Sequence, residues 1–286
     1  MILILGSNGL LGSYLANYCH RNGHNFLGVN RKEYRYDFLK INELISLLDT
    51  LEFDALVNCV GITSIDLCES DPAFAKDINQ LAPAAIAKYC KKHMKKFIHI
   101  STDHFYDYGK NYPHKETDRV SLLNEYARTK FYAEKAVLAS NINSLVLRTS
   151  MIGLSLNGDS FLDWVIESIS ANKKINLFDD AFCSFLHADQ LSKYILLSIQ
   201  NDLKGTYNLA SSSVFSKYDF VLEICKKLNI KVNLIRSSVK SMQTPRANCC
   251  GLDVSKFQKK LSLKMPSLPK IVEHTIKKES LKNLTI

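Results

Sequence analysis

The residues of this sequence best suited to acid–base chemistry are a tyrosine and a lysine four positions apart. The pattern Tyr-x-x-x-Lys occurs at Tyr36–Lys40 in a connection, at Tyr106–Lys110 in a Gly/Asn/Pro loop, and at Tyr126–Lys130 at the start of a helical segment. Side chains at i and i+4 share one face of a helix. A free phenol, with a pKa of about 10, transfers its proton poorly at neutral pH, but a neighbouring ammonium lowers that pKa. We therefore expect Tyr126 to act as a general acid or base and Lys130 to tune it.

Thr102 is the third residue of this predicted site. It lies in Ser101-Thr102-Asp103, directly after the apolar segment 97–100, which predicts a buried strand. Open α/β sheets bind ligands beyond the carboxyl ends of their strands, so the Thr102 hydroxyl can hydrogen-bond the oxygen that Tyr126 protonates. Taken singly, these residues could be a capping threonine, a helix-surface tyrosine and a solvated lysine. Together, and following a glycine turn, they favour catalysis by Thr102, Tyr126 and Lys130.

That glycine turn lies near the N-terminus and predicts a dinucleotide site. Residues 6–12 read Gly-Ser-Asn-Gly-Leu-Leu-Gly, directly after an apolar run and before a helical segment. Gly6 permits a tight turn, Gly9 lets a pyrophosphate approach backbone N–H groups, and Gly12 lets the helix pack against the strand. The spacing G-x-x-G-x-x-G is a weak signal by itself, but its place at the first strand–helix junction favours binding.

The end of the second predicted strand indicates which nicotinamide cofactor this turn would bind. NAD-specific sites place an acid there to bind the ribose 2′-OH, whereas this strand ends in Gly28-Val29-Asn30-Arg31-Lys32. Arg31 would make a bidentate contact with a 2′-phosphate. The simpler interpretation is a surface turn that happens to be basic. We expect NADPH as the cofactor, with NADH left open.

Apolar segments alternate with helical patterns over the first half of the chain, and this alternation predicts the elements that position the site. Buried strands are continuous apolar runs, and a βαβα order is typical of an α/β protein with a Rossmann-type doubly wound parallel sheet. The predicted strands are Ile2–Leu5, Phe26–Val29, Ala55–Val60, Phe97–Ile100 and Leu145–Leu147, and the predicted helices are Leu10–Arg21, Ile41–Leu51, Pro72–Lys92 and Glu125–Ala139.

The pattern changes after Arg148, which predicts a smaller C-terminal substrate-binding lobe. A helix over Leu191–Gln200 and a strand over Thr206–Leu209 return to the main sheet. Tyr218–Leu228 is helical, and the remainder is basic and irregular. The predicted domains are an NADP-binding Rossmann domain at 1–150 and 185–210 and a substrate-binding lobe at 151–184 and 211–286.

Composition excludes several classes of protein. With 46% hydrophobic and 23% charged residues, the chain is neither disordered nor of low complexity, and no uncharged apolar stretch reaches the roughly 20 residues that a membrane helix needs. The eight cysteines are scattered without a C-x-x-C pair and the first residues lack a basic leader, so we expect a reduced, cytoplasmic protein without a metal site.

The net charge of +9 is concentrated in residues 226–286, with 14 Lys and Arg against 3 Asp and Glu. Without interleaved aromatic residues, this segment does not predict nucleic-acid binding.

An ordered set of motifs runs through nearly the whole chain. Its segments are Gly6–Gly12, Asp37-Phe38, Val57–Thr63, Asp66 with Glu69, Asn79, Ser101–Asp103, Tyr126–Lys130, Arg148–Ser150, Gly205–Leu209 and Pro245–Asn248. In this set the sequence resembles the extended short-chain dehydrogenase/reductase family. Within that family it is most similar to the dTDP-4-dehydrorhamnose reductases and related sugar-nucleotide reductases.

The resemblance implies a role for each matching residue. Thr102, Tyr126 and Lys130 would be catalytic. The cofactor would contact Gly6, Asn8, Gly9, Leu10, Gly12, Arg31, Asp37, Phe38, Cys59, Val60, Gly61, Thr63 and Lys130, and the sugar nucleotide would contact Ser101, Thr102, Asp103, Ser150, Met151 and Arg246. An arginine suits the second group, because a guanidinium can bind a diphosphate in a bidentate manner.

The activity that the resemblance implies is NADPH-dependent reduction of the C4 keto group of a nucleotide-diphospho-4-keto-6-deoxy sugar, in deoxysugar and surface polysaccharide biosynthesis. Met151 stands where the rhamnose reductases have Trp, which leaves the sugar open. Sugar 4,6-dehydratases use an Asp-Glu pair, whereas Asp103 is followed here by His104.

Two alternatives to a reductase stay open. One is a C4 epimerase that retains NAD, because the same three catalytic residues serve both reactions. The other is a non-catalytic NADP-binding regulatory subunit, similar to the regulatory chain of methionine adenosyltransferase. The expected partner is a nucleotide-diphosphate sugar; a homodimer is left open, and neither nucleic acid nor a membrane is expected.

Overall fold

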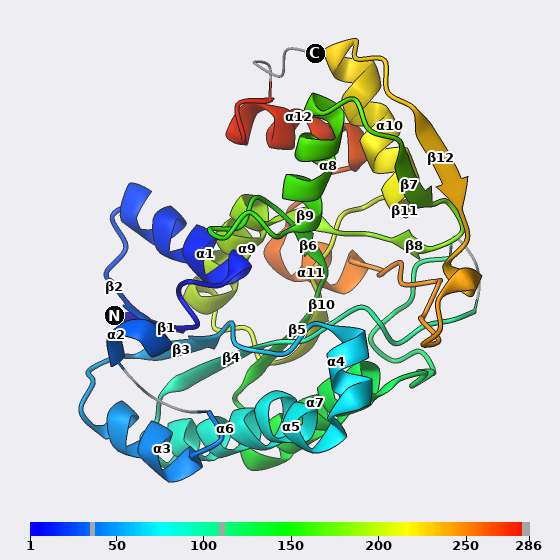
Figure 1. The fold of residues 1–286 in the computed structure, drawn as a ribbon. Helices are drawn as coiled ribbons and strands as arrows, with labels where there is room; N and C mark the ends of the chain where they lie inside the picture. Colours follow the sequence, from blue (N-terminus) through cyan, green and yellow to red (C-terminus); the bar gives the residue numbers. More distant parts are fainter. Residues whose placement is uncertain (35–37, 109–111, 282–286) are drawn as a thin grey trace. The chain divides into compact units, whose positions relative to one another are not determined.

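The chain forms two compact units, each assembled from three segments, and Figure 1 traces its course. The computed structural model describes residues 1–34, 38–108 and 112–281. The first unit comprises Met1–Thr102, Leu122–Arg148 and Ser192–Tyr207, and the second comprises Asp103–Ser121, Thr149–Leu191 and Asn208–Ile286.

A six-stranded sheet forms the centre of the first unit, with the strand order β10-β5-β4-β3-β1-β2. Strands β1 to β5 pair in parallel, with Leu5 opposite both Val29 and Asn58. The connection from β2 to β3 crosses β1, so the strand order reverses between β1 and β3, where open α/β sheets bind their ligands. The strands are β1 (Ile2–Leu5), β2 (Phe26–Val29), β3 (Ala55–Asn58), β4 (Lys96–Ile100), β5 (Leu145–Arg148) and β10 (Gly205–Asn208).

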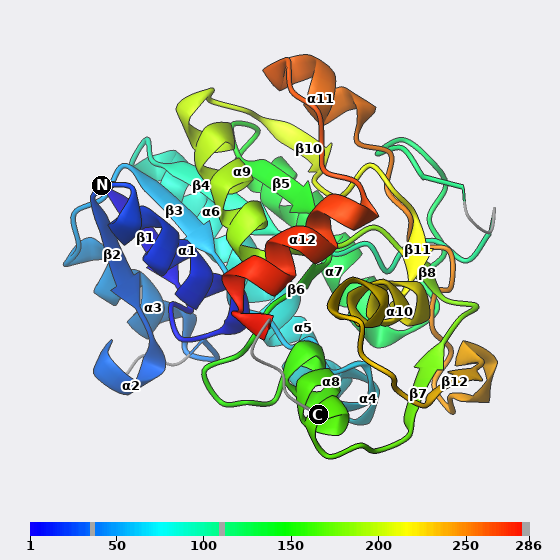
Figure 2. The same cartoon turned by 90° about the horizontal axis from the view of Figure 1, so that it is seen from above.

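Helices cover both faces of this sheet. In Figures 1 and 2, α1 and residues 192–200 of α9 lie on one face, and α3, α6 and α7 lie on the other. The doubly wound parallel sheet that the sequence predicts is therefore confirmed. The helices are α1 (Leu10–Arg21), α2 (Arg31–Tyr34), α3 (Ile41–Asp49), α4 (Ile65–Ser70), α5 (Pro72–Lys76), α6 (Ala82–Lys92), α7 (Glu125–Ser140) and α9 (Ala188–Gln200).

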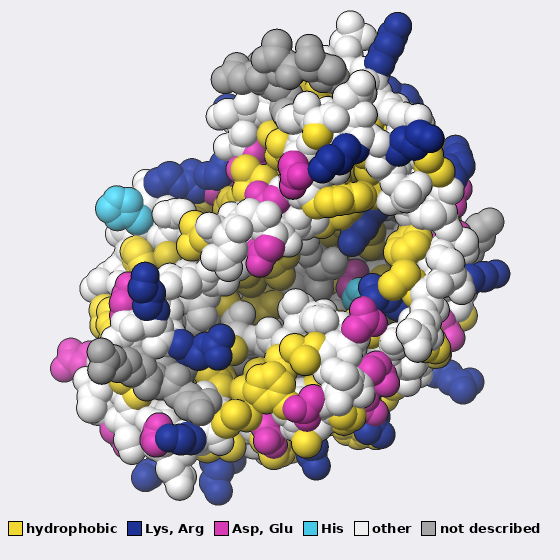
Figure 3. Space-filling model, in the orientation of Figure 1, with side chains coloured by type: hydrophobic (Ala, Val, Ile, Leu, Met, Phe, Trp, Pro, Cys, Tyr) yellow, Lys and Arg dark blue, Asp and Glu magenta, His cyan; other side chains and the backbone are white. Residues whose placement is uncertain are grey.

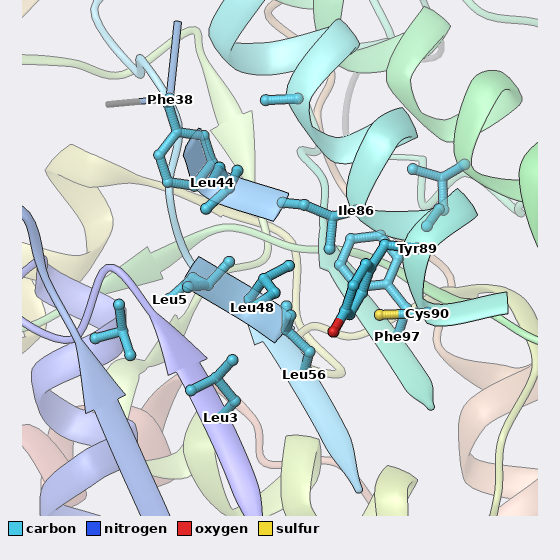
Figure 4. Packing of buried hydrophobic residues seen from close by; sticks show 14 of the residues in the cluster. Leu3, Leu5, Phe38, Leu44, Leu48, Leu56, Ile86, Tyr89, Cys90 and Phe97 are labelled. Atoms are coloured by element: carbon cyan, nitrogen blue, oxygen red, sulfur yellow. The ribbon is translucent and has the colours of Figure 1, made fainter. Parts of the chain in front are cut away.

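The apolar runs of the strands form the core between the sheet and helices α3 and α6 (Figure 4). Alternate strand residues such as Leu3 and Leu5 point into this cluster and are fully buried. Burial of one large apolar side chain contributes about 1.5–3 kcal/mol, so the cluster fixes both helices against the sheet. It joins strand residues Leu3, Leu5, Leu56 and Phe97 to Phe38 and to helix residues Leu44, Leu48, Ile86, Tyr89 and Cys90.

A π-helical turn, Asp77–Leu81, interrupts the single helix that the sequence predicts over Pro72–Lys92. α5 precedes the turn, and α6 follows it with a proline in its first turn. π turns are rare and occur often at functional sites. This one brings Asn79, which is 1% exposed, into hydrogen-bonding contact with the loop after β3.

The second unit is built from short two-stranded sheets and longer helices. β6 pairs with β9 and β7 with β12 in parallel, and β8 pairs with β11 antiparallel. Capping boxes begin α8 at Ser160 and α10 at Ser216, and such boxes satisfy backbone N–H groups that the helix itself leaves unpaired. The elements are β6 (Met151–Ile152), α8 (Phe161–Ser170), β7 (Ile175–Phe178), β8 (Phe182–Cys183), β9 (Leu186–His187), β11 (Phe215–Ser216), α10 (Lys217–Leu228), β12 (Leu234–Ser237), a 3₁₀ turn (Val239–Ser241), α11 (Ser255–Leu261) and α12 (Leu268–Lys278).

The chain after Leu228 is more regular than the sequence predicts. It contains β12, α11 and α12 instead of an irregular segment. α12 buries Ile271, Val272 and Ile276 on one face, at the spacing of an amphipathic helix. That prediction was wrong because the surrounding lysines, on the solvent side, obscured a short apolar stripe.

Residues 103–121 belong to the second unit, whereas the sequence-based division placed them in the NADP-binding domain. Hydrogen bonds within the second unit account for this difference. The His114 backbone donates to the Gly251 carbonyl over 2.8 Å, and the Asn208 amide donates to the His114 carbonyl over 2.8 Å. The role that the sequence assigns to each domain stays a prediction.

Basic and acidic side chains are interspersed over the helices at the bottom of Figure 3, which belong to the first unit. Their mixture agrees with the near balance of charges before residue 226. Over the described residues, no helix combines the length and the apolar character that crossing a bilayer requires.

Candidate functional site: a nucleotide cradle and a buried lysine

The glycine turn after β1 has a backbone that only glycine suits at two positions. Gly6 adopts a φ of +81°, in the left-handed region, and a Cβ there would lie 2.8 Å from Val60 Cγ2. A Cβ on Gly12 would lie 2.1 Å from the Gly6 carbonyl oxygen. α1 therefore packs directly on the turn.

Replacement of Gly12 by alanine is expected to lower the melting temperature by several degrees, because overpacking a tight contact costs about 1–3 kcal/mol. Gly9→Ala is the matched control for stability, since a Cβ there would lie 3.3 Å from the Gly6 carbonyl oxygen, a contact that a small shift relieves. Differential scanning calorimetry measures both variants. Equal melting temperatures for the two would contradict this account of the turn.

The N-terminus of α1 is open to an anion. Gly9 is its N-cap residue and supplies no side-chain hydrogen bond to the helix, so the first N–H groups and the positive end of the helix dipole face outward. A cavity of about 890 Å³ lies here, within the roughly 300–1,000 Å³ typical of small-molecule sites. Its lining is Gly6, Asn8, Gly9, Asn30, Arg31, Phe38, Leu39, Cys59, Val60, Gly61, Ile62, Phe74 and Ile78.

The structure brings eight of the residues predicted to bind the cofactor into this one lining: Gly6, Asn8, Gly9, Arg31, Phe38, Cys59, Val60 and Gly61. Leu10, Gly12 and Thr63 do not line it; Gly12 is buried under the turn and Thr63 is exposed. Asp37 lies outside the described residues. Sequence reasoning missed Phe74 and Ile78, whose apolar side chains come from α5 and the π turn.

Asn30, at the end of β2, was also missed as a lining residue. Its side-chain oxygen accepts the N–H groups of Lys32 and Glu33, each over 3.1 Å, and its amide donates to Glu33 Oε2 over 2.9 Å. The side chain thereby holds the first turn of α2, with Arg31 exposed at the cavity. The preference of asparagine for such local turns is the signal that could have found it.

Lys130 is a buried cation at the carboxyl end of β4. Its side chain is 5% exposed, and its ammonium donates to the Ile100 carbonyl oxygen over 2.6 Å. Burial lowers the pKa of Lys130 to about 8, while the Glu134 carboxylate opposes that shift. The ammonium therefore keeps its proton at neutral pH. Gly61 of the cavity lining is close by, since a Cβ there would lie 3.9 Å from Lys130 Nζ.

Tyr126 lies one turn before Lys130 on α7. Asn124 caps this helix by accepting the Ala127 N–H over 2.9 Å, which fixes where the helix begins. The Tyr126 ring is 8% exposed and belongs to an apolar cluster with Ile65, Cys68 and Ala75. Burial of the ring restricts the phenol to a narrow range of positions.

Asn79 joins the loop after β3 to α7. Its side-chain oxygen accepts the Ile62 N–H over 2.8 Å, and its amide donates to the Ile62 carbonyl over 3.0 Å and to Thr129 Oγ1 over 3.4 Å. Asn79 thus fixes the loop that lines the cavity relative to the helix that carries Tyr126 and Lys130. The π turn makes this contact by turning Asn79 toward the loop.

Glu134, whose carboxylate acts on the charge of Lys130, forms a buried ion pair with Arg148. Arg148 Nη2 lies 2.7 Å from Glu134 Oε2, with the two side chains 5% and 2% exposed. Ser101 Oγ donates to Glu134 Oε1 over 2.5 Å. Ser101 was predicted to contact the substrate, but its one hydroxyl proton is donated to Glu134. Thr102 is 2% exposed and is the last residue of the first segment of the first unit.

A smaller cavity, of about 160 Å³, lies within the second unit. Four residues predicted to contact the sugar nucleotide line it: Asp103, Ser150, Met151 and Arg246. Ser101 and Thr102 belong instead to the first unit. Sequence reasoning missed several other lining residues, among them His104, Phe161, Phe182, Cys183 and Lys217.

Positive charge dominates this second cavity. Burial lowers the pKa of His104 to about 4, and the charges of Lys217 and Arg246 act in the same direction. The imidazole is consequently neutral at neutral pH. Among the described residues, no group of three or more His, Cys, Asp or Glu side chains is placed to hold a metal ion.

A glycine turn at the switch point of a doubly wound sheet, followed by a buried Tyr-x-x-x-Lys helix, defines an extended short-chain dehydrogenase/reductase. The chain belongs to the family described as RmlD substrate binding domain, whose model matches residues 1–281. The resemblance seen in the sequence is confirmed.

Two relatives match along nearly their whole length. The "Probable low-salt glycan biosynthesis reductase Agl14" of Haloferax volcanii is 30% identical over 93% of this chain and 93% of its own. A dTDP-4-dehydrorhamnose reductase of Escherichia coli is 27% identical, also over 93% of both chains. A crystal structure of dTDP-4-dehydrorhamnose reductase from Bacillus anthracis in complex with NADP has a TM-score of 0.89 at 21% identity, over 97% of this chain and 98% of that one, and supports the fold.

Proposed function

We propose that this protein reduces the C4 keto group of a nucleotide-diphospho-4-keto-6-deoxy sugar with NADPH, in deoxysugar or surface polysaccharide biosynthesis. The observation that carries this proposal is Lys130, buried and charged at the carboxyl end of β4, one helical turn after a buried tyrosine. The Escherichia coli relative, named for such a reduction, supports the choice of substrate.

The cradle in the first unit fits a dinucleotide. Gly6 and Gly12 leave no room for side chains where the turn meets the helix, and the open N-terminus of α1 suits a pyrophosphate. Arg31 would bind a 2′-phosphate, and the side chains of Phe38 and Val60 would lie against the adenosine half. When bound, NADPH supplies the hydride.

Residues of this chain would donate the proton and orient the oxygen that receives it. Tyr126 donates it to the substrate oxygen, and the Lys130 ammonium eases that transfer by favouring the phenolate. Thr102 orients the same oxygen with a hydrogen bond. The Glu134–Arg148 pair, which touches no reactant in this proposal, fixes the strand ends around Lys130.

The substrate would use residues of the second unit. Arg246 offers a fork of N–H donors to a diphosphate, and Asp103 and Ser150 offer hydrogen-bonding groups to the sugar. Met151 would contact the sugar ring and help to select it. These roles of Asp103, Ser150, Met151 and Arg246 are part of the proposal.

Arg31→Ala is expected to raise the KM for NADPH about tenfold or more while leaving the KM for NADH nearly unchanged. A charge-assisted hydrogen bond contributes about 1.5–3 kcal/mol, and only NADPH carries the phosphate that makes it. Steady-state assays with both cofactors measure the ratio. Lys32→Ala, at an exposed neighbour that does not line the cavity, is the control; an equal loss with both cofactors would contradict the assignment.

The direct test of the function is a panel of dTDP-, UDP-, GDP- and CDP-linked 4-keto-6-deoxy sugars, assayed with NADPH and NADH by nicotinamide absorbance. Net consumption of NADPH with a reduced C4 is the expected result. Cofactor that survives purification, with sugar interconversion and no net consumption, would favour the epimerase alternative. Stable association with a larger enzyme and no turnover of any sugar would favour a regulatory subunit.

A homodimer and a cytoplasmic location stay predictions. Sedimentation of the purified protein measures the first, and fractionation of cells that express it measures the second.

A further inference from the structure

Lys217 is a cation in the wall of the second unit's cavity. It is the first residue of α10, and it lines the cavity together with Asp103, His104 and Arg246. Its ammonium lies 4.5 Å from the centroid of the Phe161 ring, which also lines the cavity. A cation over an aromatic face is attracted to it, so the Phe161 ring holds the Lys217 ammonium at the cavity wall.

The position of Lys217 in its helix is electrostatically unfavourable. The N-terminal end of a helix carries partial positive charge and favours acids over cations. The capping box makes no use of Lys217: Ser216 Oγ accepts the Asp219 N–H over 3.0 Å, and Asp219 Oδ2 accepts the Ser216 N–H over 2.9 Å. Residues that break a local preference are concentrated at functional sites.

Lys217 and Arg246 act on the same part of the cavity. Both line it beside His104, and both charges add to the effect of burial, which lowers the pKa of His104. His104 is neutral at neutral pH, so two cations face a single acidic side chain, Asp103, among the charged groups of the lining. A cavity with this excess of positive charge suits an anion.

The two cations differ in what they offer an anion. The Arg246 guanidinium is a planar fork of N–H donors, and the Lys217 ammonium is a compact charge that can approach from another side. The cavity, at about 160 Å³, is smaller than the roughly 300–1,000 Å³ of pockets that enclose whole small ligands. It therefore holds only part of a nucleotide sugar: the two cations suit the diphosphate, and Asp103 and Ser150 of the same lining suit the adjoining sugar.

We propose that Lys217, held by Phe161, binds the diphosphate of the nucleotide sugar together with Arg246. The inference rests on the proposed function and adds a binding residue that the sequence did not indicate. Lys217 is a substrate-binding residue in this scheme and takes no part in proton transfer.

Isothermal titration of the full chain with dTDP, UDP, GDP and CDP, under saturating NADP⁺ to fill the cradle, tests the proposal. Lys217→Gln is expected to weaken whichever diphosphate binds the wild type by about tenfold, the size of one charge-assisted contact. The corresponding nucleoside, which lacks phosphates, is expected to bind the variant and the wild type alike. Lys217→Arg, which keeps the charge, is expected to restore binding to within about threefold.

Two further variants test the aromatic ring beside Lys217 and the effect of losing a lysine elsewhere on α10. Phe161→Leu keeps an apolar wall but removes the aromatic face, and a loss of about threefold in diphosphate affinity is expected. Lys227→Gln removes an exposed lysine from the same helix, outside the cavity lining, and no loss is expected. The melting temperature of each variant shows that it is folded.

The outcomes distinguish this inference from the proposed function. Sugar reduction by the wild type, with an unchanged KM in Lys217→Gln, overturns the inference and leaves the function intact. Diphosphate binding that depends on Lys217, without turnover of any sugar, supports the inference and overturns the function. A wild type that binds none of the four nucleoside diphosphates overturns the inference, as does an equal loss in Lys227→Gln.

Discussion

Replacement of Tyr126 by phenylalanine is expected to lower kcat for NADPH-dependent reduction by about 10²–10⁴-fold, the contribution of a positioned general acid. The variant loses one oxygen atom from a ring that is 8% exposed and packed against Ile65, Cys68 and Ala75. The packing is retained, so the KM for NADPH and the melting temperature are expected to change little. Steady-state assay against the best substrate of the panel measures the loss.

Tyr132→Phe is the matched control for this prediction. Tyr132 lies on the same helix, is 48% exposed and lines a groove on the surface of the first unit. Its hydroxyl has no role in the proposed chemistry, and wild-type kcat is expected. Undiminished turnover by Tyr126→Phe would end the acid–base assignment, whereas an equal fall in both variants would point to damage to α7 as a whole.

The architecture of the first unit could be predicted because its signals are local. Short apolar runs, separated by helical spacing, match β1, β2 and β4, and the predicted helices match α1 and α3 within a few residues. The strand predicted over Ala55–Val60 ends earlier, at Asn58. Asn58 Oδ1 accepts the Val60 N–H over 3.1 Å and turns the chain out of the sheet, a local bond that an apolar run conceals.

The nucleotide cradle was predictable only in part, because it is assembled from distant segments. Gly6, Gly9 and Arg31 belong to motifs with their own spacing. Phe74 and Ile78 line the same cavity, yet each is an ordinary apolar residue of a helical segment until the fold places it there. The π turn that presents Ile78 and Asn79 leaves no recognisable pattern in the sequence.

The second cavity shows the same limit more strongly. Lys217 and His104 lie more than a hundred residues apart in the chain and share one cavity lining. The low pKa of His104 arises from burial and from two distant cations, neither of which its sequence neighbours indicate. Ser101 is the converse case: its place at a strand end predicts a substrate contact, but its proton goes to Glu134, on a helix 33 residues further along.

Glu134→Gln is expected to destabilise the protein by about 3–5 kcal/mol, the cost of breaking a buried ion pair from one side. Arg148 is 4% exposed and donates to both oxygens of this carboxylate, with Nε–O distances of 3.0 and 3.1 Å. The variant leaves the buried guanidinium without a counter-charge, while the volume of the side chain hardly changes. A fall in melting temperature, followed by calorimetry, measures the effect.

Glu125→Gln provides the control, because it breaks an ion pair on the same helix at the surface. Its partner Arg128 is 55% exposed, and such pairs contribute about 0–1 kcal/mol. The double variant Glu134→Leu with Arg148→Met is expected to be more stable than Glu134→Gln, since it leaves no buried guanidinium without its counter-charge. A double variant less stable than Glu134→Gln would contradict this account. The ion pair would then contribute more to the free energy of unfolding than an unpaired guanidinium costs, and the strand ends around Lys130 would depend on it directly.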